Sequence, residues 1–446
     1  MNDRIVLLVA ALLFLHTAPA FGEAVTLREA ISRALASNYR LKAASLEQGA
    51  ARQEVAASRS RYLPRVHLES GAVLSNAPSR VFMMKLDEAR INPETDFTQD
   101  ALNHPSARGD FRSALALEQP LLDFGISTGV ALAGKDAEAA EVALQSSREQ
   151  TAFRVYQAYL GVRKARAYSE IADQSVASAR EHARLADVRE KDGIGLKSDQ
   201  LRAATGLSEA EQRLISSKND LLLARMRLSL EVGGRQGEAL DISETPGVEE
   251  PAPAQDLVVL AQRSRPELKA GEKAVERGDL LVRQAGNAYL PTLYASAAYQ
   301  INDRDLPFGA DKDSWNLGVN LRWELFDGGL RSHRKEKAQL SRQAAAALLE
   351  NDRREVALQV TESVLRRQEA GLKLESAQAA VKAAREGVRL IALRFQNGLS
   401  TMVELMDAEA ALNRSRANLV EVENSFIGST AEIYYKAGVF LQEVMR

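Results

Sequence analysis

The chain has 446 residues, of which 45% are hydrophobic and 26% are charged, and its formal net charge is -2. A chain of this size and composition can bury a large core and is not disordered, and its near-neutral charge argues against nucleic acid as a partner. It contains no cysteine, which excludes disulfides, thiol catalysis and a lipid-modified amino-terminal cysteine.

The first residues have the pattern of a secretory signal. Arg4 precedes an apolar run from Ile5 to Leu15, and small residues follow at Ala18, Ala20 and Gly22. This run is shorter than the ~20 apolar residues that a helix needs to cross a membrane. The pattern therefore predicts export, with a signal peptide at residues 1–22.

The remaining chain contains an internal duplication. The tripeptide YLP occurs at Tyr62–Pro64 and again 227 residues later, at Tyr289–Pro291. Further on, LLDFG at 121–125 is repeated as LFDGG at 325–329, a separation of only 204 residues. The shorter separation indicates an enlarged loop in the first copy. We therefore expect a first repeat at 23–245, a linker at 246–255 and a second repeat at 256–446.

Each repeat has the same predicted elements in the same order. A helix leads to YLP, two alternating stretches follow with a polar loop between them, and a long helix, a glycine turn and a returning helix complete the repeat. Pro64 and Pro291 stand where helix must change to strand, because proline ends a helix and disfavours helical geometry before it. Each repeat should thus contribute one β-hairpin, with strands at 65–72 and 111–118, and at 293–301 and 315–325.

The predicted long helices dominate the chain. No proline interrupts the segments 123–193 and 327–398, so about 65 residues of helix would extend ~100 Å. Small and apolar residues in the second of these segments alternate at spacings of three and four, which is typical of a coiled-coil seam: Leu374, Ala377, Val381, Ala384, Val388, Ile391 and Phe395. The sequence therefore predicts a mainly α fold with a small β part.

The strand predicted at 315–325 carries both tryptophans of the chain on its apolar side. At ~3.3 Å per residue and a tilt of ~40°, Trp315 and Trp323 would lie roughly 20 Å apart along a barrel axis, near the ~25 Å between the aromatic girdles of an outer-membrane barrel. Four strands cannot close a barrel, and an open sheet edge cannot lie in lipid. Either several chains pool their strands, or the strand belongs to a soluble sandwich with core tryptophans.

These motifs resemble those of the TolC-like outer-membrane efflux channel family. The resemblance rests on the duplication, on YLP before each hairpin, on DFG and DGG after each, and on the turns DGIGLKSDQ and NGLSTMVELMDA. It implies a homotrimer with a twelve-stranded β-barrel in outer-membrane lipid and a periplasmic α-barrel of twelve helices. It also implies a passive exit duct for efflux or type I secretion, served by an inner-membrane pump and a periplasmic membrane-fusion adaptor, with neither catalysis nor a cofactor.

The resemblance also assigns a periplasmic constriction. Glu404 and Asp407 match the positions where acidic side chains of three chains surround the constriction, and residues three apart share one face of a helix. An alternative reading is a capping box, because Thr401 and Glu404 have its spacing at a helix start. Both roles can coexist for Glu404, whereas Asp407 has no capping explanation.

The glycine turns at the ends of the long helices resemble the tips that contact the adaptor. These are Gly193 with Ile194 and Gly398 with Leu399. A C-cap glycine explains the glycines alone, but not why the same pattern ends both helices. Asp199 matches a family aspartate that helps to latch the tunnel shut. However, Phe395 and Ser400 replace the latch partners that some members carry.

Two other functional classes fit the sequence less well. A periplasmic coiled-coil adaptor or spacer would not need lipid-facing strands. A secreted enzyme would need a catalytic constellation, and the histidines have neither metal-ligand spacing nor a serine and an acid arranged for hydrolysis. The enlarged polar loop, Asn76 to Asp110, is expected to face the outside of the cell.

Overall fold

The computed structural model describes residues 24–245, 247, 250–309 and 312–445. The predicted signal peptide and residues 246, 248 and 249 of the predicted linker lie outside the described residues. The described chain forms two compact units. Unit 1 consists of residues 24–47, 141–270 and 348–445, and unit 2 of residues 48–140 and 271–347.

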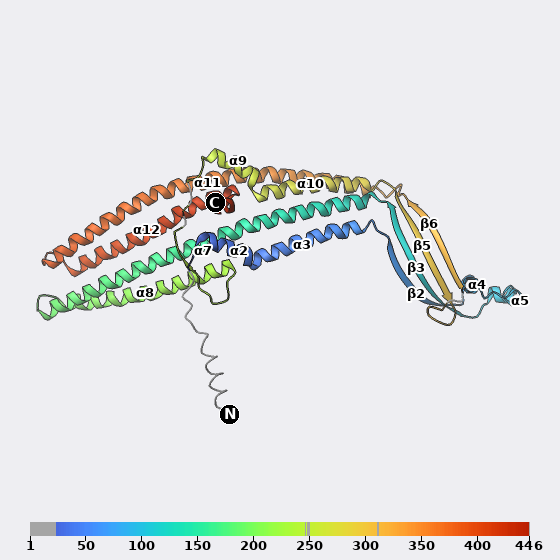
Figure 1. Ribbon diagram of the computed structural model, residues 1–446, viewed down its shortest axis with the longest axis horizontal. Coiled ribbons are helices and arrows are strands. Elements are labelled where there is room, and N and C mark those ends of the chain that lie inside the picture. Colours follow the sequence, from blue (N-terminus) through green and yellow to red (C-terminus); the bar gives the residue numbers. More distant parts are fainter. Residues whose placement is uncertain (1–23, 246, 248–249, 310–311, 446) are drawn as a thin grey trace, which may run out of the picture. The chain divides into compact units, whose positions relative to one another are not determined.

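Unit 2 contains one four-stranded antiparallel sheet (Figure 1). Its strands are β2 (Arg65–Ser75), β3 (Arg108–Leu122), β5 (Thr292–Asp303) and β6 (Lys312–Arg322), in the order β2-β3-β5-β6. The two predicted hairpins are confirmed, and pairing of β3 with β5 joins them. The edge strands β2 and β6 each keep one side that pairs with no other strand of the described residues.

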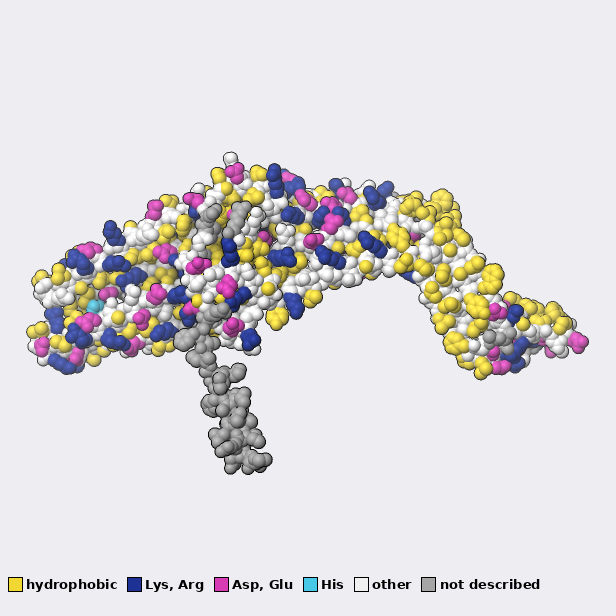
Figure 2. All heavy atoms as spheres, viewed as in Figure 1, with side chains coloured by type: hydrophobic (Ala, Val, Ile, Leu, Met, Phe, Trp, Pro, Cys, Tyr) yellow, Lys and Arg dark blue, Asp and Glu magenta, His cyan; other side chains and the backbone are white. Residues whose placement is uncertain are grey.

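The apolar face of this sheet is exposed. Trp315 pairs with Tyr299, and Leu317, Val319 and Leu321 follow on the same face. Trp315 is 72% exposed and Trp323 57% exposed, so neither is a core residue of this chain. Figure 2 shows hydrophobic side chains crowded over the strands. The soluble sandwich is therefore the wrong reading.

The predicted strand at 315–325 is too long at its carboxyl end. β6 ends at Arg322, and the indole of Trp323 donates a hydrogen bond to the Tyr289 carbonyl at 3.0 Å. The cause is the register with its partner strand. Arg322 pairs with Thr292, the first residue of β5, and Pro291, which would lie opposite Trp323, has no amide to donate. The turn into the next helix comes only later, where Gly328 and Gly329 have φ angles of +68° and +89°.

The first hairpin also differs from its prediction. β3 runs from Arg108 to Leu122, well beyond the predicted 111–118, and its register shifts between Pro120 and Leu122, where proline lacks the amide that a ladder needs. The expected polar loop holds three short helices, α4 (Pro78–Asp87), α5 (Pro93–Asp96) and α6 (Gln99–Asn103).

The long helices were predicted correctly. α7 (Phe124–Lys191) and α11 (Leu330–Gln396) have 68 and 67 residues, hence about 100 Å each. The returning helices are α8 (Lys197–Val232) and α12 (Met402–Ala437), and the helices before the sheet are α3 (Tyr39–Ser60) and α10 (Pro266–Asn287). Pro64 and Pro291 lie directly before β2 and β5. Within the described residues, no helix combines the length and the hydrophobicity that a membrane-spanning helix needs.

Tyr159 organises the middle of unit 1. In this region β1 (Ala24–Val25) pairs in parallel with β4 (Asp241–Ile242). The fully buried Tyr159 hydroxyl lies 3.2 and 3.0 Å from the carbonyl oxygens of Val25 and Glu244, and it accepts from the Glu244 amide at 3.3 Å. A single side chain on α7 thereby holds the amino-terminal segment and the segment after α8 together.

Replacing Tyr159 with phenylalanine should destabilise unit 1 by about 1–3 kcal/mol, because buried backbone groups would lose their partner. We expect a lower melting temperature in detergent by circular dichroism. Tyr39→Phe is the control, since this tyrosine is exposed. Equal melting temperatures for the two variants would contradict this role of Tyr159.

Candidate functional site

The candidate site is the end of unit 1 where α7 turns into α8 and α11 turns into α12. Gly193 and Gly398 have φ angles of +74° and +72°. The next amides, of Ile194 and Leu399, donate five residues back, to Arg189 at 3.0 Å and to Arg394 at 2.8 Å. Both long helices therefore end in the same Schellman motif, which requires the left-handed glycine.

The residues after these glycines point into solvent. Ile194 is 69% exposed and Leu399 is 68% exposed. A Schellman motif usually packs this apolar side chain back against its helix. The C-cap thus explains the glycines, but it does not explain two exposed apolar side chains at equivalent positions, which are typical of a contact surface.

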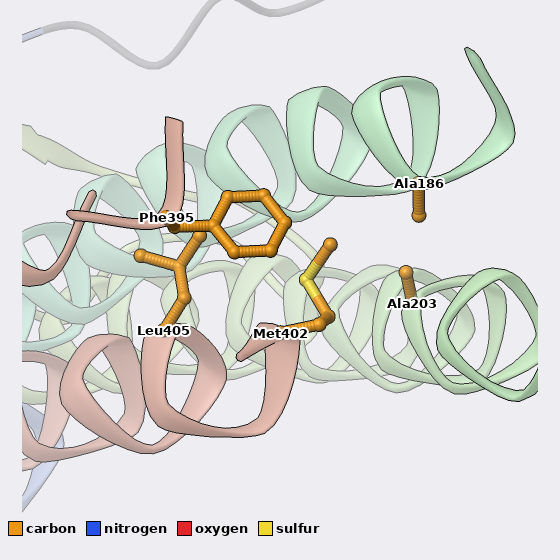
Figure 3. Close-up of a cluster of buried hydrophobic side chains, with 5 residues drawn as sticks. All are labelled: Ala186, Ala203, Phe395, Met402 and Leu405. Atoms are coloured by element: carbon orange, nitrogen blue, oxygen red, sulfur yellow. The ribbon is translucent and has the colours of Figure 1, made fainter. Parts of the chain in front are cut away.

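An apolar cluster beneath the turns joins all four helices (Figure 3). Its buried members come one each from α7, α8 and α11 and two from α12: Ala186, Ala203, Phe395, Met402 and Leu405. The two alanines allow close approach of their helices, and the ring of Phe395 fills the space between the two helical hairpins. Phe395 is a packing residue here.

Arg189 links the two hairpins. Its guanidinium lies 4.7 Å from the centre of the Phe395 ring and donates a hydrogen bond to the Phe395 carbonyl at 2.9 Å. A cation near the carbonyl end of a helix is also favoured by the helix dipole. Sequence reasoning missed Arg189, although its place in the last turn of α7 was a usable signal. Asp199, in the first turn of α8, lines a hollow of about 190 Å³ beside Arg189 and Phe395.

Glu404 closes a capping box at the start of α12. Its amide donates to the Thr401 hydroxyl at 3.2 Å, and its carboxylate accepts from the Thr401 amide at 2.9 Å and from the Ser400 hydroxyl. These donors, the Ser400 hydroxyl first, hold the pKa of Glu404 below its usual range. Glu404 is thus an ionised, exposed carboxylate folded over the helix start. Asp407 lies one turn further along, also exposed.

A polar stripe runs along the seam between α7 and α12. Tyr168, Ser175 and His182 are spaced seven residues apart, and Arg189 is the next in the series. The Tyr168 hydroxyl donates to the Ala417 carbonyl at 3.3 Å, the Asn413 amide to the Ser175 hydroxyl at 3.2 Å, and His182 lies 3.6 Å from the Glu409 carboxylate. Polar layers at a heptad position weaken a seam relative to apolar ones. The seven-residue spacing was visible in the sequence, but the stripe was missed.

The part of the chain that the structure describes contains no group of three or more histidine, aspartate or glutamate side chains placed to hold a metal ion. The contacts that the site does show are those of charge and packing. Apolar contacts close the end of the helices, one arginine links the hairpins, and acidic side chains line the start of α12.

The sequence matches the family model described as outer membrane efflux protein over residues 30–234 and 257–438. The alkaline protease secretion protein AprF of Pseudomonas aeruginosa is 25% identical, over 97% of this chain and 88% of its own length. The proteases secretion protein PrtF of Dickeya chrysanthemi is 23% identical, over 95% and 90% respectively. The solved structure of the Campylobacter jejuni CmeC outer membrane channel has a TM-score of 0.77 at 16% identity, covering 92% of this chain and 85% of that one. This likeness shows a shared fold.

Glu404→Gln should remove the acid sensitivity of the α12 cap. Because the pKa of Glu404 is lowered, its stabilisation is present above the ordinary value of 4.5 and is lost as pH falls through the lower value of the folded state. Hydrogen exchange, normalised to intrinsic rates, should show amide protection at the first turn of α12 falling severalfold below pH 4.5. The variant should show weaker protection that does not change with pH in this range.

Asp407→Asn is the matched control for this measurement. It removes a charge from the same helix face but leaves the capping box intact, so it should keep the wild-type pH dependence. If instead the acid sensitivity disappears in Asp407→Asn and survives in Glu404→Gln, the cap is not what Glu404 provides.

Proposed function

Since this chain belongs to the outer membrane efflux protein family, we propose that three copies of it form one gated exit duct. The chain is an outer-membrane channel protein of the TolC type that extends into the periplasm and serves as an exit for efflux or type I secretion. Family members act in tripartite systems, which implies an adaptor and a pump as partners. We propose three further points: the number of copies, the contact with lipid and the roles of individual residues.

The open sheet edges are the observation that most directly supports a trimer. An apolar, exposed sheet face fits lipid, but the unpaired backbone groups along β2 and β6 could not remain there without partners. If β2 of one copy pairs with β6 of the next, three copies give twelve strands and no edge remains. The exposed tryptophans Trp315 and Trp323 then fall near the two surfaces of the membrane.

Exposed apolar stripes on the helices support the same assembly. Leu358, Leu365 and Leu372 lie seven residues apart on α11, and Ile215 and Leu222 lie seven apart on α8. All five side chains are exposed in the single chain. Such stripes are typical of coiled-coil seams, so we expect them to pack between copies.

The periplasmic gate follows from the candidate site. In a trimer, Glu404 and Asp407 would place six carboxylates around one axis, which repels anions and attracts cations. Opening requires the two hairpins of each chain to separate, and the polar stripe on α7 makes that seam weaker than an apolar one. In this proposal Arg189 holds the hairpins together within one chain, and Asp199, which lines the hollow beside it, acts as a latch residue.

The exposed turns complete the proposal. Ile194 and Leu399, after Gly193 and Gly398, would contact the membrane-fusion adaptor, and the pump joined to that adaptor would determine the cargo.

Pro64 and Pro291 would act as helix-to-strand hinges, and the repeats would comprise residues 23–245 and 256–446 around the linker. The relatives named for protease secretion match almost the whole chain, which favours polypeptide cargo. The alternative of a periplasmic spacer lacks support from the family match.

Single-channel conductance in planar bilayers tests the gate. The wild-type protein should give small, cation-selective openings. The double variant Glu404→Ala, Asp407→Ala should give larger and less selective ones, because the carboxylates that narrow the duct are gone. The isosteric pair Glu404→Gln, Asp407→Asn should lose selectivity with a smaller gain in size. Equal conductance and selectivity in all three proteins would show that the constriction lies elsewhere in the duct.

Charges on the apolar sheet face test the barrel. Val319→Arg, nearer the middle of the membrane, should cost about 2–4 kcal/mol, and Trp315→Arg, near one surface, about 0–1 kcal/mol. Together they should remove most of the protein from the outer-membrane fraction. Asn316→Arg with Asn320→Arg, on the opposite face of β6, is the matched control and should fractionate normally. Normal membrane fractionation of both variants would be incompatible with a lipid-facing β6.

A further inference from the structure

The insertion between β2 and β3 is a folded unit. Residues 76–107 form it, whereas the equivalent segment between β5 and β6 comprises only residues 304–311. The rings of Phe82 and Phe97 pack edge to face at 5.7 Å, and Lys85 donates to the Asp96 carboxylate at 2.6 Å. The Asn92 amide also donates to Asp96, at 2.7 Å. These contacts fix α5 to α4, and α6 lies in contact with both.

α4 covers the polar face of the sheet at its end farthest from the long helices. It contacts β3 and β6, and Glu88, directly after α4, pairs with Arg108, the first residue of β3. Arg108 shares the polar face with Asp110, since alternate residues of a strand lie on one face. Asp110 and its partner Asn302 are only 7% and 2% exposed, whereas Glu69, on the same face nearer the long helices, is exposed.

α4 carries apolar side chains on two opposite sides, and the charged residues Arg80 and Asp87 are exposed beside the outer ones. Val81 and Met84 are buried, whereas Met83 and Leu86 are 52% and 46% exposed. At 100° per residue, the two exposed side chains lie opposite the buried ones. Because the buried side rests on the polar face of the sheet, Met83 and Leu86 point away from that face. In a closed barrel this is the direction of the barrel axis.

We propose that α4 of three copies forms an outer constriction of the duct, in which Met83 and Leu86 of each copy contact those of the other two. This inference rests on the trimeric barrel proposed above. The occupant of the exposed side of α4 is thus a second copy of this chain. Lipid is excluded as the occupant because α4 lies on the polar face, opposite the face that carries Trp315.

The dimensions support this arrangement. Twelve strands spaced ~4.8 Å apart and tilted ~40° close a barrel with a radius of roughly 12 Å. α4 has ten residues and is therefore about 15 Å long, similar to the width of the four-stranded sheet. Three such helices, each crossing one third of the opening, would lie roughly 6 Å from the axis, which is about the radius of a helix with its side chains. Little open space would remain between them.

Such a constriction has a clear consequence for the duct. A narrow apolar ring disfavours water and ions, so the duct would be narrowed at both ends, by carboxylates in the periplasm and by apolar side chains outside. The pair of Glu88 with Arg108, and Arg90 with Asp305 at 3.4 Å, would hold each α4 to its own sheet.

Cysteine cross-linking tests the proposal directly, because the chain has no cysteine of its own. Leu86→Cys and Met83→Cys are oxidised in outer-membrane preparations and separated on non-reducing gels. We expect a dimer band with up to about two thirds of the chains, since only two of three symmetry-related thiols can pair. Leu74→Cys is the control, because this exposed residue lies on the barrel wall, where its copies would be roughly 20 Å apart.

Native mass spectrometry of the same preparations tests the trimer separately from the outer constriction. A trimer in which neither Leu86→Cys nor Met83→Cys gives a dimer band, even with a short bis-maleimide, would overturn the outer constriction and leave the proposed function standing. A monomer would overturn the trimer itself. A trimer that cross-links at positions 83 and 86 but not at 74 supports the constriction.

Discussion

The unpaired backbone along two sheet edges is the constraint on which the rest of the structure depends. Lipid offers no hydrogen bonds, so an apolar sheet can enter it only when every strand has a neighbour on both sides. Four strands from one chain cannot achieve this, so in the proposed duct β2 and β6 pair with other copies of the chain. Once the strands are shared, the helices that continue from them must also lie around a common axis, because α3, α7, α10 and α11 directly precede or follow the strands.

In the proposed gate, the periplasmic end combines contacts that close it with contacts that allow it to open. The buried cluster around Phe395 gains free energy from apolar contacts, and Arg189 adds a charged link across the hairpins. Further along α7, the stripe of Tyr168, Ser175 and His182 replaces apolar layers with polar contacts. Separation of the hairpins there exposes groups that water can satisfy, which lowers the cost of opening compared with an apolar seam.

The fold could be predicted from the sequence where a local pattern determines it. Proline at 64 and 291, the lack of proline along the long helices and strict alternation in the strands each have a direct structural meaning. The end of β6 could not be predicted from alternation, because Trp323 continues it; the strand ends where its register with β5 places Pro291 opposite Trp323. The helices of the insertion were also missed, since α4 is short and is fixed by contacts with β3 and β6 that are distant in sequence.

The acidic end of α12 shows why a capping role and a functional role need not compete. Three copies of Glu404 around one axis would repel one another, and repulsion between carboxylates raises their pKa values and favours proton uptake. The capping donors from Ser400 and Thr401 act in the opposite direction and lower the pKa of Glu404. The local hydrogen bonds that start the helix would thereby help Glu404 to keep its negative charge within a ring of like charges. The capping box is in this sense a condition for the constriction, because a ring of carboxylates that became neutral on assembly could neither repel anions nor attract cations.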